Sequence, residues 1–228
     1  MTRTPPNIPR CPGRDEIRSA TERVLVRGRG GKADVLVVRT ADGRVVVKDF
    51  AGRGPWGRWL GKLQIRRERA VYGWLEGVEG IPAFVGRIDA LALAIEWIDG
   101  DGLAFVQVPE RDVPGILAAL RRVLDAIHAR GVVHNDLRGR ENVLLRRGGG
   151  IAVVDLAGAL RLRPGGMAHR LLFPLLATAD EAGYLKWKGM LAPRSYTPEE
   201  ERTLRRFERW RRLWPFNPKR RKAQPGAP

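Results

Sequence analysis

Apolar residues in the first part of the chain occur in short runs separated by polar turns. Between residues 23 and 48 the runs VLV, VLVV and VVV are separated by a glycine cluster and by the turn ADG. Short apolar runs bounded by turn residues are typical of β-strands joined by hairpins. We therefore expect three strands over these residues, and strand character again in residues 81–89 and 91–100.

Two longer stretches follow the period of an α-helix instead. Residues 60–76 suit a helix, although Gly73 weakens its last turn. Residues 113–131 end at Gly131, a helix stop, and carry apolar side chains at helical spacing: Ile116, Leu117, Leu120, Val123, Leu124 and Ile127. The pattern predicts an α+β chain, with a strand-rich first part that contains one helix, a mainly helical second part, and a boundary near residues 99–102.

The two ends of the chain lack such patterns. Residues 1–14 are polar and proline-rich and residues 223–228 are small and proline-rich, so we expect a disordered arm and a disordered tail. No apolar run approaches the length of a membrane span, and the N-terminus lacks the apolar region of a secretory signal. With Cys11 as the single cysteine and no Cys/His cluster, the sequence indicates a cytoplasmic chain without an internal disulfide or zinc.

The charge of the chain is strongly positive. Lys and Arg number 42 against 25 Asp and Glu, a formal net charge of +17. Such a surface attracts polyanions, which include nucleic acid, anionic lipid and phosphorylated small molecules. Charge alone does not choose among these classes.

A glycine cluster lies between the first two expected strands. Gly28, Gly30 and Gly31 lie in the segment GRGGKADV, which fits the pattern G-x-G-x-x-A-x-V. A hairpin without side chains lets its backbone approach the phosphates of a nucleotide. A plain glycine turn explains the same residues, so this signal is weak by itself.

A lysine and a glutamate follow at spacings that a phosphate site requires. Lys48 ends the third expected strand, and Glu68 comes 20 residues later within the expected helix. A pair between them would hold the lysine extended toward a phosphate. The alternatives are a solvated strand-end lysine and a Glu68 paired with a neighbouring arginine, and Glu76 or Glu79 takes its place if the helix register differs.

The segment VVHNDLRGRENVLL, residues 132–145, places polar residues between two apolar runs. His134, Asp136 and Asn142 fit a catalytic loop in which the aspartate accepts the proton of an attacking hydroxyl and the asparagine ligates a metal ion. Asp155 follows 13 residues later, at the end of another apolar run, where it would hold Mg²⁺. Read alone, the loop is equally a polar turn between two strands.

Phosphoryl transfer explains why these residue types would occur together. The reaction needs little covalent help, so the protein supplies a positioned base, oxygen ligands for a metal, and a cation for the phosphates. Bound Mg²⁺ also removes the cost of burying two carboxylates. The glycine hairpin, the lysine, the glutamate, the loop and the last aspartate occur in the required order.

With these residues in place, the chain resembles a small bacterial protein-kinase-like protein of the RIO-like and lipopolysaccharide (Kdo) kinase-like branch. The loop of that branch often reads H-N-D-L-x-K-E-x-N, and here it reads HNDLRGREN. The resemblance implies a bilobal protein-kinase-like fold that uses ATP and Mg²⁺, with a small β-rich N-lobe over residues 15–100. A reduced helical C-lobe follows over residues 101–222, which ends in a basic amphipathic helix.

The resemblance also implies individual roles. Lys48 would be the phosphate-binding lysine and Glu68 its partner, Asp136 the catalytic base, and Asn142 and Asp155 the metal ligands. Glycines of the hairpin, Gly28 and Gly30, would cover the phosphates. Backbone groups of Glu96 and Ile98 in LAIEWIDG would bond adenine at the hinge between the lobes.

The chain departs from ordinary protein kinases in ways that bear on its acceptor. Asn142 lies six residues after Asp136, one more than usual, and the metal motif reads Asp155-Leu-Ala instead of D-F-G, with no A-P-E after it. Arg138 or Arg140 would serve as the cation near the γ-phosphate. These departures count against a protein substrate more than against phosphoryl transfer.

Two basic clusters bear on the partner. Residues 51–67 carry five basic residues and two tryptophans, and residues 202–222 carry ten basic residues beside an apolar stripe of Leu204, Phe207, Trp210 and Leu213 or Trp214. A basic amphipathic helix with aromatic residues suits an anionic membrane, which places the chain in the cytoplasm or at the inner face of the membrane. The stripe equally suits packing on the C-lobe. No nucleic-acid-binding motif occurs.

Two functions follow from these observations. The first is an ATP- and Mg²⁺-dependent kinase that phosphorylates a hydroxyl, either of an envelope lipid or saccharide or of a protein Ser/Thr. The second is a catalytically silent protein of the same fold that acts as a scaffold at an anionic membrane or nucleic-acid surface.

Overall fold

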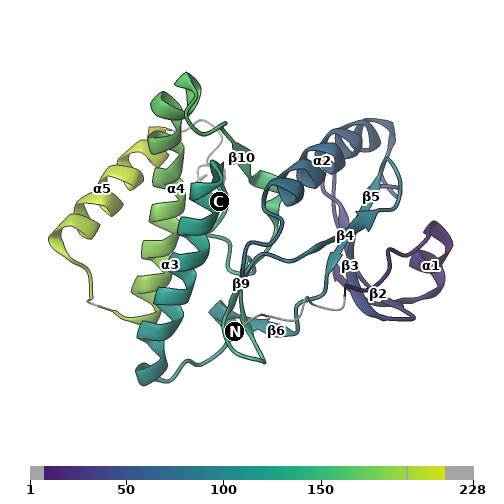
Figure 1. Cartoon of the computed structure of the whole chain (residues 1–228), viewed down its shortest axis with the longest axis horizontal. Coiled ribbons are helices and arrows are strands. Elements are labelled where there is room, and N and C mark those ends of the chain that lie inside the picture. Colours follow the sequence, from purple (N-terminus) through teal and green to yellow (C-terminus); the bar gives the residue numbers. More distant parts are fainter. Residues whose placement is uncertain (1–7, 194, 214–228) are drawn as a thin grey trace, which may run out of the picture.

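The strand-rich first part of the chain forms a five-stranded antiparallel sheet (Figure 1). The computed structural model describes residues 8–193 and 195–213. The order in the sheet is β1-β2-β3-β5-β4, and its strands are β1 (Thr21–Val26), β2 (Asp34–Thr40), β3 (Gly43–Asp49), β4 (Phe84–Arg87) and β5 (Ala92–Glu96). The three strands expected before residue 50 and the two expected after residue 80 are confirmed.

Alternation along β3 decides which side chains face which neighbour. Val45 and Val47 are fully buried in a small core with Ile17, which belongs to the short helix α1 (Arg14–Ser19). Because successive side chains of a strand point to opposite faces, Lys48 lies on the other face of the sheet. Its register partner in β5 is Leu93, a residue of the larger core.

Helix α2 (Pro55–Trp74) covers that second face. It begins five residues before the expected start, because Pro55 suits the first turn of a helix. Gly61 lets the helix approach the sheet closely, since a Cβ there would lie 2.5 Å from the ring of Phe50. The buried side of α2 includes Ile65, Glu68 and Tyr72, which recur at helical spacing.

After residues 97–99 the chain leaves the large sheet and enters a second, mainly helical part. A three-stranded sheet has the order β6-β8-β9, with β6 (Gly100–Gly102), β8 (Val143–Arg146) and β9 (Ile151–Val153). A two-stranded sheet pairs β7 (Val132–Val133) with β10 (Leu160–Arg161). Three single turns of 3₁₀-helix are η1 (Leu103–Phe105), η2 (Glu110–Asp112) and η3 (Leu156–Gly158).

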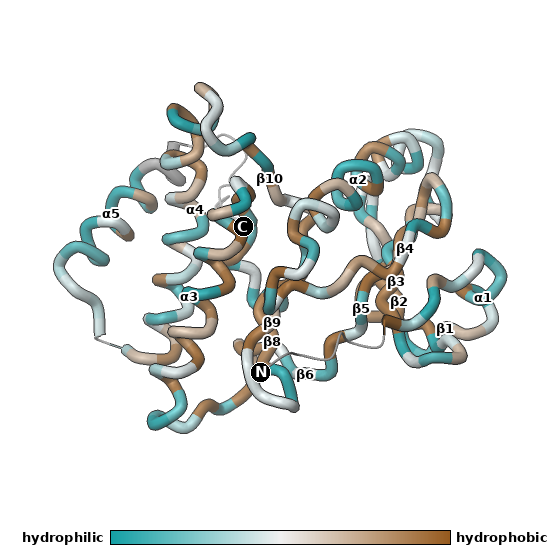
Figure 2. Tube along the Cα trace, viewed as in Figure 1, coloured by the Kyte–Doolittle hydropathy of each residue, from teal (hydrophilic) through white to brown (hydrophobic). Residues whose placement is uncertain are grey.

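Three long helices complete this part: α3 (Val113–Ala129), α4 (Met167–Leu191) and α5 (Pro198–Leu213). All six apolar residues predicted to face inward from α3 are buried, and Trp187 of α4 is fully buried beside them in the same core. Figure 1 shows α3, α4 and α5 gathered on one side of the molecule, and the five-stranded sheet with α1 and α2 on the other. Strands β2, β3, β8 and β9 include some of the most hydrophobic segments of the trace (Figure 2).

The ends of the chain differ in part from the expectation. Residues 8–14 pack against the sheet instead of forming part of a disordered arm, because Pro12 is buried and Arg14 donates to Asp49 at 2.6 Å and also to Asp89. The helix α1 is additional to the single helix expected in this part. The expected tail, residues 223–228, lies outside the described residues. Among the described helices, none has the length and apolar character that crossing a membrane requires.

Candidate active site

Lys48 and Glu68 meet between the large sheet and α2. The Nζ atom of Lys48 lies 2.6 Å from Oε1 of Glu68, and both side chains are buried. The two alternative partners considered for the lysine, Glu76 and Glu79, are exposed. The pair predicted between strand and helix is therefore present, with Glu68 as the partner.

Lys48 also reaches Asp155, which lies 107 residues later in the chain. Its Nζ atom lies 2.7 Å from Oδ1 of Asp155. Asp155 follows β9 with φ of 64° and ψ of 72°, in the left-handed region that only Gly, Asn and Asp adopt routinely. Its Oδ1 also accepts a hydrogen bond from the backbone N–H of Ala157 at 3.4 Å. One ammonium group thus joins two carboxylates from distant elements.

Burial and charge act in opposite directions on the pKa values of these three groups. Burial lowers the pKa of Lys48, but the carboxylates of Glu68 and Asp155 outweigh this effect and raise it above its ordinary value. Burial raises the pKa of Glu68 in spite of the neighbouring lysine. Burial also acts to raise the pKa of Asp155, yet the charge of Lys48 keeps that pKa below its usual range. Lys48 is therefore held as a cation and Asp155 as an anion.

The loop between β7 and β8 brings Asp136 and Asn142 together. Nδ2 of Asn142 donates to the backbone oxygen of Asp136 at 2.7 Å and to its carboxylate Oδ2 at 3.0 Å. Gly139 makes this contact sterically feasible, since a Cβ there would lie 2.4 Å from the same nitrogen. Asn142 is buried and Asp136 is exposed. A buried amide therefore holds a carboxylate that is exposed to solvent.

His134 is a positioning residue in this loop. Its ring is fully buried, and its Nδ1 accepts a hydrogen bond from the backbone N–H of Asp136 at 3.2 Å. Its Nε2 lies 3.0 Å from the carbonyl oxygen of Val154, so the neutral ring carries its proton on Nε2. The imidazole thus ties Asp136 to the residue that precedes Asp155.

Asp180 of α4 binds the backbone of this loop, a role that was not predicted from the sequence. This fully buried carboxylate accepts hydrogen bonds from the backbone N–H groups of His134 and Asn135, both at 2.7 Å, and lies 3.0 Å from Nε2 of His128. Asn135 has φ of 65°, a conformation these bonds hold in place. The only sequence signal was a pair of acidic residues, Asp180 and Glu181, in the otherwise small and apolar stretch LLATADEAG.

The next turn of α4 continues the same support. Nε1 of Trp187 donates to the carbonyl oxygen of Leu137 at 2.9 Å, and Lys186 donates to that of Arg138. Gly183 lets the helix approach, since a Cβ there would lie 2.8 Å from Cβ of Leu137. The loop that carries Asp136 is therefore fixed on a rigid helix.

Asn142 and Asp155 are brought close by the β8–β9 pairing. The backbone N–H of Val154 donates to the carbonyl oxygen of Asn142 at 2.9 Å. Both side chains offer oxygen atoms, which are the ligands that Mg²⁺ prefers. Among the described residues Oδ2 of Asp155 accepts no hydrogen bond, and no cluster of three or more His, Cys, Asp or Glu could hold a metal. Two such oxygen ligands would suit Mg²⁺ only if water and phosphate supplied the other ligands, and a metal site here stays a prediction.

The glycine hairpin between β1 and β2 has little room for side chains at its base. A Cβ on Gly28 would lie 2.3 Å from the carbonyl oxygens of both Lys32 and Ala33, and Gly30 has φ of 60°. The N–H of Gly28 donates to Oδ1 of Asp34 at 2.8 Å. Gly31 is half-buried beside Leu60 of α2. The hairpin is therefore closed by its own hydrogen bonds.

The predicted hinge residues lie where the chain leaves the large sheet. The N–H of Glu96 donates to the carbonyl oxygen of Ala83 at 2.9 Å, and Ala83 N–H donates back to the Glu96 side chain at 2.9 Å instead of to its carbonyl. Ile98 is buried, and its N–H donates to no other residue of the described chain. A contact with adenine stays a prediction for both.

The two candidate loop cations, Arg138 and Arg140, have different partners. The guanidinium of Arg138 lies 3.4 Å from both the Ala182 carbonyl and Glu208 Oε1, and 5.2 Å from the ring centroid of Phe207. Arg140 is exposed and lies over the ring of Phe105 at 5.1 Å. Arg138 is thus engaged with α4 and α5, and a role for either at a phosphate stays a prediction.

No protein-family model matches the chain, and a comparison with curated proteins finds no match either. The interpretation of the site depends on its own geometry and chemistry.

Proposed function

We propose that this chain is an ATP- and Mg²⁺-dependent phosphotransferase with a protein-kinase-like bilobal fold, and that it phosphorylates a hydroxyl group. The observation that carries the proposal is the position of the Lys48 ammonium, 2.6 Å from Glu68 and 2.7 Å from Asp155. A strand lysine, a helix glutamate and an aspartate that ends a distant strand have converged on one point. An ion pair that only stabilised the fold would need Lys48 and Glu68 alone. It would not need the third residue, Asp155, which is half-exposed.

Each residue then has a distinct task. Glu68, buried on α2, keeps Lys48 extended, and Lys48 binds the α- and β-phosphates of ATP. Asn142 and Asp155 would hold Mg²⁺, which neutralises the charge that develops on the phosphates during transfer. Adenine would bond the carbonyl of Glu96 and the N–H of Ile98, between the sheet part and the helical part.

Asp136 is the proposed catalytic base. Nδ2 of Asn142 donates a hydrogen bond to Oδ2 of Asp136. The other carboxylate oxygen of Asp136, Oδ1, accepts no hydrogen bond from the described residues. The acceptor hydroxyl gives its proton to Asp136 while its oxygen bonds the γ-phosphorus, and the bond from that phosphorus to the β,γ-bridging oxygen breaks. The acceptor is a hydroxyl of an envelope lipid or saccharide, or of a protein Ser/Thr.

Transfer of labelled γ-phosphate tests this function. Wild-type protein is incubated with Mg·ATP and either envelope lipid extract or total protein, beside Asp136→Asn and Asp155→Asn. We expect labelled product with wild type and a loss of at least about a hundredfold in both variants. Asp125→Asn, an exposed position on α3, is the control and keeps full activity. Nucleotide binding without turnover for any acceptor would favour the silent scaffold instead.

A further inference from the structure

The first half of α2 exposes a pair of stacked tryptophans. Trp56 and Trp59 are 71% and 51% exposed, and their ring centroids lie 4.9 Å apart. Leu63 is exposed one turn further along. The three residues are three and four positions apart, so they share one face of the helix. Large apolar side chains with this exposure form a contiguous patch that no described element covers.

The first half of α4 exposes a second apolar face. Met167 and Leu171 are 78% and 71% exposed, and Leu172 and Leu175 are exposed beside them. Met167, Leu171 and Leu175 recur every four residues and therefore form one stripe. Soluble proteins rarely leave such a stripe without a partner.

Both segments carry positive charge and no negative charge. Residues 51–67 contain five basic residues and no Asp or Glu, and residues 156–179 contain three arginines and no Asp or Glu. On α2, Arg58, Lys62 and Arg66 are exposed between the apolar positions. The apolar patches therefore belong to a cationic surface that complements an anionic one.

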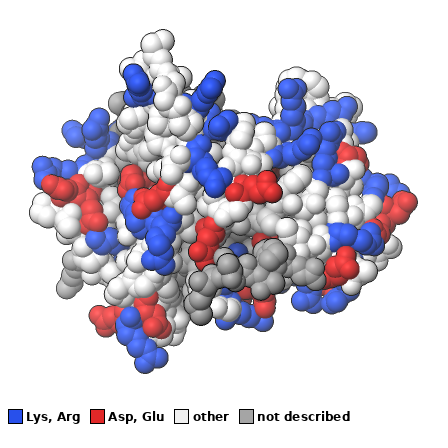
Figure 3. All heavy atoms as spheres, viewed as in Figure 1, with Lys and Arg blue, Asp and Glu red and all other residues white. Residues whose placement is uncertain are grey.

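Helix α2 contacts residues that lead into α4. Arg67 of α2 donates to the carbonyl oxygen of Ala159 at 2.7 Å, and the guanidinium of Arg161 lies 4.5 Å from the ring centroid of Trp74. Figure 1 shows α2 and the start of α4 along the same upper edge of the molecule. In Figure 3, Lys and Arg side chains lie between uncharged residues along that edge.

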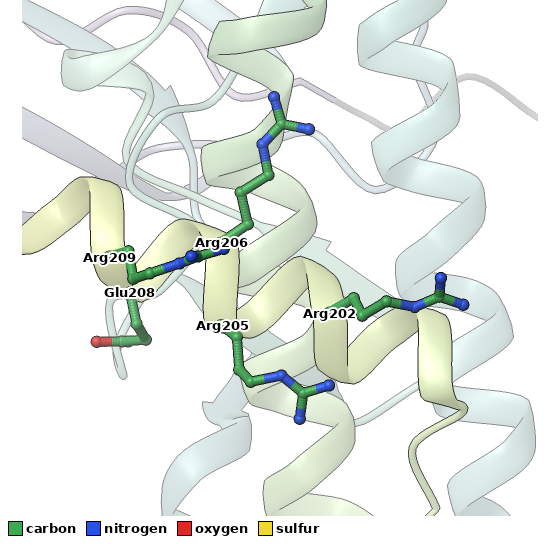
Figure 4. Close-up of a pocket in the computed structure, with 5 residues that line it drawn as sticks. All are labelled: Arg202, Arg205, Arg206, Glu208 and Arg209. Carbon is green, nitrogen blue, oxygen red and sulfur yellow. The ribbon is translucent and has the colours of Figure 1, made fainter.

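Helix α5, the other basic segment, is less suited to the same role. Phe207 of its apolar stripe is only 6% exposed, so this part of the stripe packs on the protein. Trp210, Leu213 and Trp214 lie outside the described side chains. Arg202, Arg205, Arg206, Glu208 and Arg209 line an open hollow of about 620 Å³. In Figure 4 the guanidinium groups of Arg205 and Arg206 extend in opposite directions, so they do not converge on one ligand.

We propose that the exposed face of α2 and the first half of α4 dock on the surface of an anionic lipid bilayer. Trp side chains favour the headgroup level, Met and Leu enter the acyl boundary, and Lys and Arg bind the lipid phosphates. Stacked tryptophans with arginines also suit single-stranded nucleic acid, but the aliphatic stripe of α4 offers no ring on which a base could stack. The docking surface is independent of phosphoryl transfer and goes beyond the proposed function.

Vesicle co-sedimentation of the full chain without nucleotide tests this surface. Vesicles of phosphatidylglycerol and phosphatidylcholine are compared with vesicles of phosphatidylcholine alone, at about 0.05 M and about 0.3 M salt. We expect the wild type to pellet with anionic vesicles at low salt and severalfold less at high salt. Trp56→Ser/Trp59→Ser and Leu171→Ser/Leu175→Ser should each weaken binding by roughly tenfold.

Met190→Ser is the matched control, because Met190 is an exposed apolar residue in the last turns of the same helix α4. It should bind as the wild type does. Equal pelleting of both double variants and the wild type would overturn the proposal. The proposal would also be overturned if the wild type bound transfer RNA but pelleted with neither kind of vesicle. Because no nucleotide is present, neither result bears on phosphoryl transfer.

Discussion

Asp180 accepts a hydrogen bond from the backbone N–H of His134 at 2.7 Å across 46 residues of sequence. The same fully buried carboxylate accepts a second backbone N–H from Asn135 and contacts the His128 ring. Asp180→Asn replaces one accepting oxygen by a donor, which leaves at least one of the two backbone N–H groups unpaired. We expect the free energy of unfolding to fall by about 3 kcal/mol.

Urea denaturation measures this loss. Asp125→Asn is the control, because Asp125 is exposed on α3 and its substitution should change stability by less than about 0.5 kcal/mol. If both variants unfold at the same urea concentration as the wild type, Asp180 does not hold the loop.

Replacing Lys48 by Met leaves Glu68 buried without its cation. Burial already raises the pKa of Glu68, and loss of the lysine charge raises it further. A carboxyl whose pKa is higher in the folded state than in the unfolded state destabilises the protein increasingly as pH rises between the two values. Lys48→Met should therefore cost about 3 kcal/mol near neutral pH and less in acid.

Urea denaturation at two pH values checks the sign of this effect. The stability difference between wild type and Lys48→Met should shrink by at least about 1 kcal/mol from about pH 8 to about pH 5.5. Lys62→Met, at an exposed position of α2, should show no such dependence. A deficit that is the same at both pH values would mean that Glu68 is not held as a buried anion by Lys48.

Asn142→Asp places a second carboxylate beside Asp136. Nδ2 of Asn142 lies 3.0 Å from Oδ2 of Asp136 in the wild type, so the variant brings two negative charges to about that distance, where they repel each other. If Asp136 is the base, the acidic limb of the kcat/KM profile should move up by at least about one pH unit. Gln107→Glu adds the same charge on an exposed loop and should leave the profile in place. If the acidic limb of the kcat/KM profile of Asn142→Asp lies at the same pH as in the wild type, Asp136 is not the base.

Gly28→Ala forces the glycine hairpin to change shape. Its Cβ would meet two backbone carbonyl oxygens at 2.3 Å, and neither can rotate away as a side chain would. We expect a loss of about 2 kcal/mol in stability and roughly tenfold weaker nucleotide binding, measured by calorimetry. Gly115→Ala in α3 meets no atom within 4 Å and should instead stabilise the protein by about 0.5 kcal/mol. Equal nucleotide binding by Gly28→Ala and the wild type would show that the hairpin backbone is not used.

Local patterns allowed most of the strands and the long helices to be predicted. Alternation and helical spacing depend on a few neighbouring residues, so β2, β3 and α3 follow from the sequence alone. The start of α2 was placed five residues late: Pro55 suits the first turn of a helix, but Gly57 also suits a loop, and its close packing against Arg53 and Gly30 shows why the helix tolerates it.

The candidate site was predictable where its residues end apolar runs, as Lys48 and Asp155 do. Which glutamate pairs with Lys48 depends on helix packing, and Glu68 is the buried one. The role of Asp180 could not be predicted, because its carboxylate binds a backbone group 46 residues away and no sequence spacing indicates such a contact. The burial of Phe207 could not be predicted either, because the apolar stripe of α5 to which it belongs suits a membrane as well as a protein core.

The proposed function requires that Lys48, Asn142 and Asp155 form a site for Mg·ATP. Isothermal titration calorimetry of ATP binding with and without Mg²⁺, on wild type and Asp155→Asn, tests it most directly. We expect Mg²⁺ to tighten ATP binding by the wild type at least about tenfold and to have no such effect on Asp155→Asn. Wild-type affinity that does not depend on Mg²⁺, or an equal gain in both proteins, would contradict it.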